Sequence, residues 1–408
     1  MNKWWTLILS LCFVTSSLYA QVPGCTDPLA TNFSVSATQN DGSCIYAPTT
    51  VMPQLTLPLD TLVLETSGII FWNNSLWTHN DNFDSHIYAI DTIDGSILST
   101  QLLNALNVDW EEISQDSNYV YVGDVGNNVT GNRTDLKIFR IEKSSILNGT
   151  PVIDTILFNY SDQVNFSNAG LNNTDYDCEA FIVSSDSIYL FTKQWLNHGT
   201  SVYVLPKTPG MHSAILRESF NIQGLITGAT FLEDKKLIAL CGYSTLLQPF
   251  VYLLYDYDSN GFFSGNKRKI EVTLSLHQVE GIATSNGLKY YLTNDIFAPG
   301  GNIITPQKFH ILDLSPYVNS YLTTFTGVND IFTGNDMEVF PNPASEQINV
   351  LVNGQYDYTL FDLSGRIILS GLLHNNVNSI ETSGVETGMY LLKIGISKVQ
   401  LISIVKAN

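Results

Sequence analysis

Basic residues are scarce in this sequence. Only 19 of its 408 residues are lysine or arginine, against 38 aspartates and glutamates, and the formal net charge at pH 7 is −19. A surface this acidic repels phosphate backbones and anionic membrane surfaces. We therefore expect no nucleic acid partner, whereas divalent cations could bind locally.

Charged residues of either sign are few, and extended helical periodicity is missing. Charged residues make up 14% of the chain and hydrophobic residues 44%, which is enough apolar material for a sizeable core. No long stretch repeats its apolar residues every 3.6 positions. The 20 tyrosines and 20 phenylalanines favour strands over helices. These features predict an all-β protein.

Long hydrophobic runs are absent except at the N-terminus. Residues 1–20 combine a basic start at Lys3, an apolar run over Trp4–Val14 and small residues up to Ala20. This pattern is typical of a cleaved signal peptide, which would carry Cys12 away with it. The alternative is a membrane anchor, but the run is shorter than the roughly 20 residues that span a bilayer. We expect no transmembrane segment in the mature chain.

Cysteine is also rare, with five in the whole sequence. Cys25 and Cys44 flank a polar segment, residues 21–48, and we expect them to form a disulfide, as export to an oxidising compartment permits. Cys178 and Cys241 lie inside apolar strand patterns. We interpret them as buried small hydrophobic residues rather than as a second disulfide or a nucleophile.

Two short segments carry acidic residues that could serve as calcium ligands. The segment between Cys25 and Cys44 contains Asp27, Asn40 and Asp41, too few carboxylates for a full calcium shell. Asp256–Gly261 begins like an EF-hand loop, but its twelfth position is Lys267 instead of glutamate. For both segments we favour turns capped by Asx hydrogen bonds.

One pattern recurs five times between residues 50 and 320. A corner of small or acidic residues precedes a hydrophobic strand, a polar turn and an aromatic-rich strand, and a further β-rich stretch follows. The copies are Glu65–Asp81, Trp110–Gly126, Cys178–Lys193, Gly228–Tyr243 and Val279–Asp295. Their spacing of roughly 45 to 70 residues is close to that of four-stranded propeller blades.

We therefore predict a five- or six-bladed β-propeller over residues 50–320, followed by a small C-terminal β-sandwich. Radial stacking buries both faces of each small sheet, which one sheet cannot do alone. Thr56–Leu64 could close the ring as the outer strand of the last blade. A sixth blade around Val152–Tyr160 and a pair of β-sandwiches are the alternatives.

Three glutamates occupy equivalent positions in the repeat. Alignment of the copies pairs Glu111, Glu179 and Glu280, with Ser67 and Ala229 in the remaining two copies. Equivalent positions on innermost strands point toward one axis, where carboxylates would repel each other without a cation. Ca²⁺ prefers such oxygen ligands, so a metal site is one hypothesis. The other is that each glutamate caps backbone N–H groups of the neighbouring blade.

A hydrolase site has little support from motifs. His79 with Asp81 and Ser67 suggests a nucleophile and a base, but G-x-S-x-G, H-E-x-x-H and Walker motifs are absent. We favour a structural role for His79 inside a blade.

The last residues form a separate pattern. After a linker over residues 321–336, residues 337–408 alternate apolar and polar positions between glycine turns, which predicts the sandwich. Three motifs stand out, namely Phe340–Ala344, Tyr358–Arg366 and Gly388–Ile394. In these residues the segment resembles the type A C-terminal sorting domain of the type IX secretion system.

The resemblance implies a route and a partner. The signal peptide would deliver the chain to the periplasm, and the secretion machinery would recognise residues 337–408. The protein would then be released or attached to the outer cell surface. The middle loosely resembles uncharacterised bacterial β-propellers, which fixes no activity. We expect an exported propeller that binds an extracellular ligand, glycan or protein. The alternative is a metal-dependent hydrolase of phosphoesters or lactones at the propeller channel.

Overall fold

The computed structural model describes residues 21–302, 304–326, 337–352, 356–363, 365–374, 376–394 and 398–404. Residues 1–20, the predicted signal peptide, lie outside this set. The chain divides into two compact units at Thr326 and Gly327. Among the described residues, none of the helices combines the length and apolar character needed to cross a membrane.

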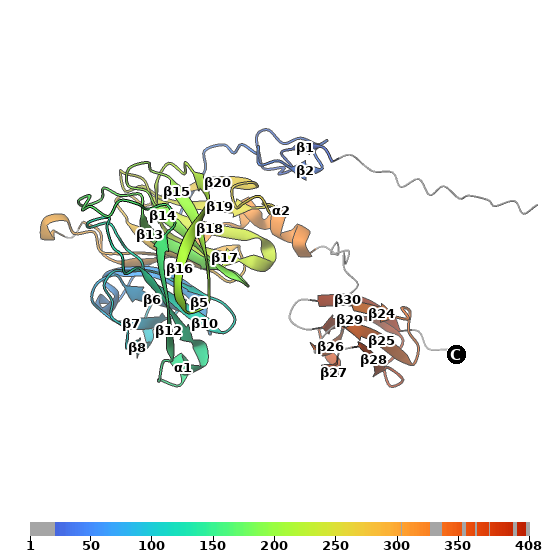
Figure 1. Cartoon of the computed structure of the whole chain (residues 1–408). Helices are drawn as coiled ribbons and strands as arrows, with labels where there is room; N and C mark the ends of the chain where they lie inside the picture. Colours follow the sequence, from blue (N-terminus) through green and yellow to red (C-terminus); the bar gives the residue numbers. More distant parts are fainter. Residues whose placement is uncertain are drawn as a thin grey trace, which may run out of the picture. The chain divides into compact units, whose positions relative to one another are not determined.

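Each of the five sequence repeats forms the inner hairpin of one propeller blade. Figure 1 draws this unit, coloured from blue to orange, as strands with few helices. The innermost strands are β5 (Thr66–Trp72), β9 (Trp110–Gln115), β13 (Asp177–Val183), β17 (Leu225–Leu232) and β21 (Val279–Thr284). The second strands are β6 (Ser75–Asn80), β10 (Tyr119–Asp124), β14 (Ser187–Lys193), β18 (Leu237–Tyr243) and β22 (Lys289–Asn294). The two strands of every hairpin pair antiparallel.

Two further strands complete each blade. The third strands are the β-rich stretches that follow each repeat: β7 (His86–Ile90), β11 (Lys137–Glu142), β15 (Thr200–Pro206), β19 (Pro249–Tyr255) and β23 (Lys308–Asp313). The outer strands are β8 (Ile97–Leu102), β12 (Ile153–Tyr160), β16 (Gly210–Phe220), β20 (Asn266–Val272) and β4 (Leu55–Pro58). The described chain therefore contains five blades, and the suggested sixth blade is only the outer strand β12.

Pairing between strands distant in sequence closes and reinforces the ring. β4 lies antiparallel to β23, so the predicted closing segment completes the fifth blade. β12 pairs parallel to β16, which joins the second and third blades into one eight-stranded sheet. The short strand β3 (Thr50–Val51) adds in parallel to β20 at the edge of the fourth blade.

Hydrophobic side chains fill the space between every pair of neighbouring blades. Five buried clusters lie at the five blade interfaces of the described ring. The last cluster packs Ile69 and Leu76 of the first blade against Tyr291 and Phe309 of the fifth. This contact shows that the ring is closed by packing as well as by the β4–β23 pairing.

The segment before the propeller is held by a disulfide and docks on the fourth blade. Cys25 and Cys44 are bonded, and the short strands β1 (Pro23–Gly24) and β2 (Gln39–Asn40) pair in parallel. The Asp27 carboxylate accepts hydrogen bonds from Tyr46 Oη at 2.8 Å and Tyr255 Oη at 2.6 Å. Its acidic group therefore anchors the segment to β19.

Helices are few and short. They are α1 (Lys143–Leu147), α2 (Ser315–Thr326) and the 3₁₀ turns η1 (Thr61–Val63), η2 (Glu233–Lys235) and η3 (Pro299–Gly301). α2 corrects two sequence expectations, since no helix was expected and residues 321–326 were assigned to the linker. Val318 and Leu322, four positions apart, are buried in the cluster between the fourth and fifth blades. The remaining linker residues, 327–336, lie outside the described set.

The C-terminal unit consists of two facing sheets. One contains β24 (Met337–Phe340), β25 (Gln347–Val352) and β28 (Asn376–Glu381), and the other contains β27 (Ile367–Leu373), β26 (Tyr356–Asp362), β29 (Gly388–Ile394) and β30 (Lys398–Ile404). Tyr390, Leu392 and Ile394 are buried between them, whereas Leu391 is only half-buried. The alternation of strand side chains explains the difference.

Candidate functional site

All five innermost strands carry a β-bulge at the same place. In each, one residue is skipped by the pairing with the second strand. The skipped residues are Gly68, Glu111, Glu179, Thr227 and Glu280. A bulge re-aims the side chain of the extra residue and sharpens the local twist. The repeated corner in the sequence therefore has a structural cause.

The bulges also correct the alignment of the repeats. Glu111, Glu179 and Glu280 are equivalent, but Gly68 and Thr227 occupy the other two positions, so the assignment of Ser67 and Ala229 was wrong. These two copies lack the glutamate that marks the corner. The register was therefore ambiguous until the strand pairing fixed it.

Seven carboxylates gather at one end of the innermost strands, together with one lysine. The carboxylates lie at the start of an innermost strand, or at or just after the end of a second strand. We call this group the axial acidic cluster: Asp81, Asp109, Glu111, Asp177, Glu179, Glu280, Asp295 and Lys193. Glu111 and Glu179 interact electrostatically, as do Glu179 and Glu280. The three predicted glutamates are thus electrostatically coupled members of one cluster.

Burial is the main cause of the raised pKa values of Glu111, Glu179 and Glu280. Desolvation raises the pKa of Glu111, Glu179 and Glu280 well above the ordinary value, and repulsion from neighbouring carboxylates adds to the effect. All three side chains are at least nine-tenths buried, with exposed fractions of 6%, 3% and 7%. Carboxyls in such surroundings hold their protons at neutral pH unless a cation is present.

Lys193 supplies a cation from within the protein. Its Nζ lies 2.5 Å from Glu179 Oε2 and donates to Tyr243 Oη at 3.0 Å. Burial opposes its charge, but the Glu179 carboxylate and other neighbours hold the pKa of Lys193 well above its usual value. Lys193 is therefore an ammonium ion rather than a free amine nucleophile. Its ion pair with Glu179 is the only one formed within the cluster in the described chain.

The predicted metal role remains a prediction. In the part of the chain that the structure describes, no three His, Cys, Asp or Glu side chains are arranged to hold a metal ion. The argument that converging carboxylates require a cation stands, but Lys193 meets part of that requirement. The sequence did not indicate this, because Lys193 lies at the end of an apolar strand, where a lysine usually extends into solvent.

Glu112 was missed by the sequence reasoning and lies on the propeller axis. Its side chain is fully buried, with Oε2 accepting from Ala229 N at 2.6 Å and Oε1 accepting from Ile113 N at 3.0 Å. Ala229 belongs to the fourth blade and Glu112 to the second, so the side chain crosses the axis. A Cβ on Gly68 would lie 2.7 Å from Oε1, so the first blade also approaches closely. Glu112 therefore links the second and fourth blades across the axis.

The outer carboxylates of the cluster face solvent in part. Burial, followed by the charge of a neighbouring carboxylate, raises the pKa of Asp109 to about 6, of Asp81 to about 7 and of Asp295 to about 8. Two buried oxygens, Glu280 Oε2 and Asp295 Oδ1, have no hydrogen-bond partner among the described residues. The cluster therefore has acceptors that the protein itself does not use.

Stability should fall as pH rises, because of Asp81 and Asp295. Their folded-state pKa values are raised from 3.8 to about 7 and about 8, so the native state keeps protons that the unfolded chain has released. This contribution is fully present below pH 3.8 and is lost as the pH rises through the two folded-state pKa values to about 8. We expect the free energy of unfolding to drop by at least about 2 kcal/mol from pH 5 to pH 8, since one pKa unit is worth about 1.4 kcal/mol.

Urea unfolding at both pH values measures this drop, with D81N/D295N as the reference. The amides mimic the neutral acids, so the double variant should lose much less stability between pH 5 and pH 8. If both proteins lost the same free energy of unfolding between pH 5 and pH 8, Asp81 and Asp295 would not titrate as described.

Loops next to the cluster are held by further charged groups. Asp177 accepts from Asn127 N at 2.6 Å and from Trp195 Nε1 at 2.8 Å. Asp124 pairs with Arg133 at 2.7 Å and with Lys137 at 2.9 Å. Asp124 and Asn127 therefore shape the loop that follows β10. The Trp195 ring lies beneath Lys193 Nζ, which is 4.6 Å from the ring centroid.

His79 and Ser67 do not form a nucleophile–base pair. Ser67 Oγ donates to the Glu111 carbonyl at 2.6 Å, and His79 Nδ1 lies 3.1 Å from the carbonyl of Asn80. His79 is fully buried edge-on against Trp110, and burial lowers its pKa to about 4. A histidine this hard to protonate is a poor general base at neutral pH.

The two calcium-like segments contain capped turns. Asn40 Oδ1 accepts from Gly42 N, Asp41 Oδ1 from Ser43 N and Asp258 Oδ1 from Asn260 N. Asp256 instead receives a hydrogen bond from Asn40 Nδ2 at 2.9 Å, which joins the two segments. The side chains are therefore used to dock the disulfide segment on the fourth blade.

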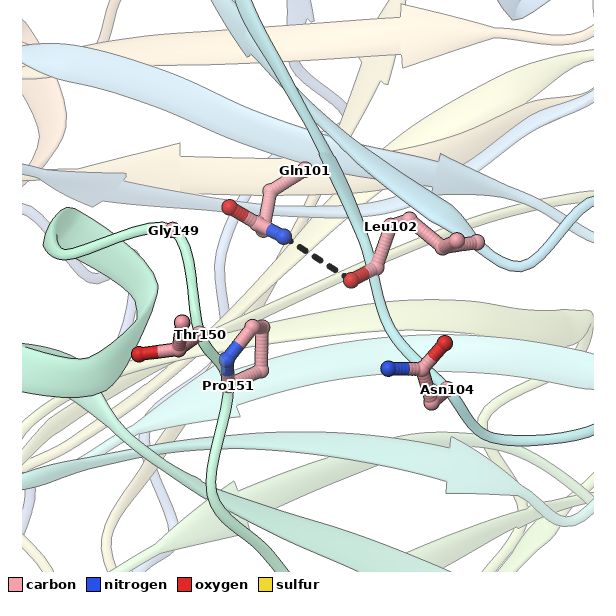
Figure 2. Close-up of a pocket in the computed structure, with 6 residues that line it drawn as sticks. All are labelled: Gln101, Leu102, Asn104, Gly149, Thr150 and Pro151. Carbon is pink, nitrogen blue, oxygen red and sulfur yellow. Dashed lines mark hydrogen bonds between the residues drawn. The ribbon is translucent and has the colours of Figure 1, made fainter.

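A cavity of about 320 Å³ lies away from the cluster, at the outer strand of the first blade. Figure 2 shows its lining from the end of β8 and from the loop after α1: Gln101, Leu102, Asn104, Gly149, Thr150 and Pro151. Gln101 Nε2 donates to the Leu102 carbonyl at 2.9 Å. None of these side chains titrates near neutral pH, so the cavity offers no acid or base.

The fold and the C-terminal unit define an exported β-propeller protein. Residues 338–405 match the family described as the secretion system C-terminal sorting domain. This is the sorting domain of type IX secretion, and the protein is secreted or attached to the outer cell surface. The resemblance of the three C-terminal motifs is thereby confirmed.

Solved structures with a similar fold include WD40-repeat proteins. The RRP9 WD40 repeats share 10% identity over 60% of this chain and 67% of theirs, with a TM-score of 0.31. A chain of the mitotic checkpoint complex shares 11% sequence identity, over 66% of this chain and 97% of its own length, with a TM-score of 0.33. U3-55K shares 10% sequence identity, over 61% of this chain and 68% of its own length, with a TM-score of 0.29. At these low scores the blade assignment rests on the strand pairing. A comparison with curated proteins finds no match.

Proposed function

We propose that this exported propeller is an extracellular binding module whose ligand site is the axial acidic cluster. The observation that carries the proposal is Glu280 Oε2, a buried carboxylate oxygen without a partner among the described residues. Leaving such a group unsatisfied costs about 1–3 kcal/mol. A ligand that donates to Glu280 would recover that free energy.

Electrostatics favour the same site. Seven carboxylates surround one lysine, and Asp81, Asp109 and Asp295 are only partly buried. Charges of one sign that lie close together attract ligands of the opposite sign. The acidic surface as a whole would steer such ligands toward the protein.

The proposal is tested by ligand capture with the full mature chain. Immobilised protein is exposed to panels of glycans, peptides and cations, and each hit is measured again with Glu280→Gln. The matched control is Asp234→Asn, which removes one charge from a side chain that is 72% exposed in the fourth blade. Binding that E280Q weakens and D234N leaves intact is the expected result. If E280Q bound every captured ligand as tightly as the wild type does, the proposed site would be refuted.

A metal-dependent hydrolase remains the second candidate, because Asp109 and Asp81 have pKa values near those suited to general acid–base catalysis. Glu111, Glu179 and Glu280 would hold the ion in that case. Calcium-dependent melting and turnover of phosphoesters and lactones test it, with all three glutamates changed to glutamine. Turnover that needs the metal and these glutamates would replace the binding proposal.

A further inference from the structure

We infer that the ligand of the axial acidic cluster is a protonated primary amine on an alkyl chain. This inference rests on the proposed function and names its ligand class. The shared chemistry is that of a free polyamine and of a lysine side chain on a partner protein.

Lys193 shows how the cluster holds an ammonium group. Its Nζ is paired with a carboxylate, bonded to the hydroxyl of Tyr243 and placed over two aromatic rings. The distances from Nζ to the ring centroids are 4.6 Å for Trp195 and 5.1 Å for Tyr243. Carboxylates combined with aromatic faces are a common recognition device for ammonium ions.

One lysine does not saturate the cluster. Glu280 forms no ion pair with Lys193 among the described residues, although the two interact over a longer distance. Glu280 Oε2 and Asp295 Oδ1 both lack a hydrogen-bond donor in the described chain. Asp295 is partly exposed and interacts electrostatically with Asp81 and Glu65. An ammonium entering from solvent would therefore meet carboxylates of the first and fifth blades.

An ammonium suits this arrangement better than a divalent metal ion. Ca²⁺ requires six to eight oxygens at roughly 2.3–2.6 Å, and no three ligating side chains converge in this way in the described residues. An ammonium has three N–H donors and so needs at most three acceptors, fewer than a calcium shell requires.

Calorimetric titration of the full mature chain tests the inference. The probes are 1,5-diaminopentane, a glycine-flanked lysine peptide, calcium chloride and the neutral analogue 1,5-pentanediol, at pH 7.5 and low salt. We expect at least one amine probe to bind and the diol to be inert. Glu280→Gln and Asp295→Asn should each weaken amine binding at least about tenfold, because a hydrogen bond between charged groups is lost.

Two design features keep the outcome interpretable. Asp295 is partly exposed, so D295N reports on the site if E280Q fails to fold, and D234N should bind like the wild type. Binding of the diamine but not the peptide indicates a free polyamine, and the reverse indicates a protein partner. Calcium binding that needs Glu280, without amine binding, overturns this inference and leaves the proposed function standing. Absence of any ligand sensitive to E280Q or D295N overturns both.

Discussion

Replacing Glu112 with alanine should destabilise the propeller by about 4 kcal/mol or more. The substitution removes the acceptor of two buried N–H groups, those of Ile113 and Ala229, and leaves a cavity on the axis. An unsatisfied buried donor costs about 1–3 kcal/mol, and the loss of buried side-chain volume adds to that cost. Urea unfolding of the full chain, followed by tryptophan fluorescence, measures the loss.

Glu112→Gln distinguishes the stability that the hydrogen bonds contribute from the stability that side-chain packing contributes. Glutamine fills the same volume but has one acceptor oxygen, so its amide group would face an N–H donor. We expect roughly half the loss seen with alanine. The control is Glu271→Gln on β20, where the side chain is exposed, and it should change stability by less than about 0.5 kcal/mol. A glutamine variant as stable as the wild type would mean that Glu112 does not tie the blades together.

Lys193→Met should cost about 3–5 kcal/mol of stability. Lys193 and Glu179 form an ion pair in which each side chain is 4% exposed, and removal of one partner leaves a buried charge uncompensated. Methionine keeps most of the side-chain volume. The loss of stability therefore measures the effect of removing the charge rather than the effect of opening a cavity. The measurement is the midpoint of urea unfolding at pH 7.

The double variant E179Q/K193M completes the thermodynamic cycle. Replacing both charges removes the unpaired group, so we expect the double variant to recover most of the stability lost by K193M alone. Additive losses in the cycle would show that the two side chains do not act as a pair. A recovery would establish Lys193 as the structural cation of the cluster.

Repetition made the fold predictable. The five copies mapped onto the inner hairpins, and the stretches that followed became the third strands, because period-two alternation and turn residues are local signals. Thr56–Leu64 was placed in the last blade, since a ring needs a closing strand. The helix α2 escaped detection because its packed apolar residues, Tyr317, Val318, Tyr321 and Leu322, cover little more than one turn, too short a stretch for a helical period to stand out, and packing against the blades stabilises it.

The site was harder to predict than the fold. Glu111, Glu179 and Glu280 were found because they repeat, whereas Glu112, their neighbour on the axis, occurs in one blade only. Lys193 was also missed, since nothing local distinguishes a buried lysine from a solvated one. Contacts across a ring join residues far apart in the sequence, and a single sequence contains no record of them.

The pairing of β4 with β23 constrains when this protein can mature. One of the first strands to be synthesised must wait for one of the last, so the circle stays open until nearly all of the propeller has left the ribosome. Contacts this distant in the chain slow folding. Closure of the ring is therefore among the last steps by which this unit acquires its final shape.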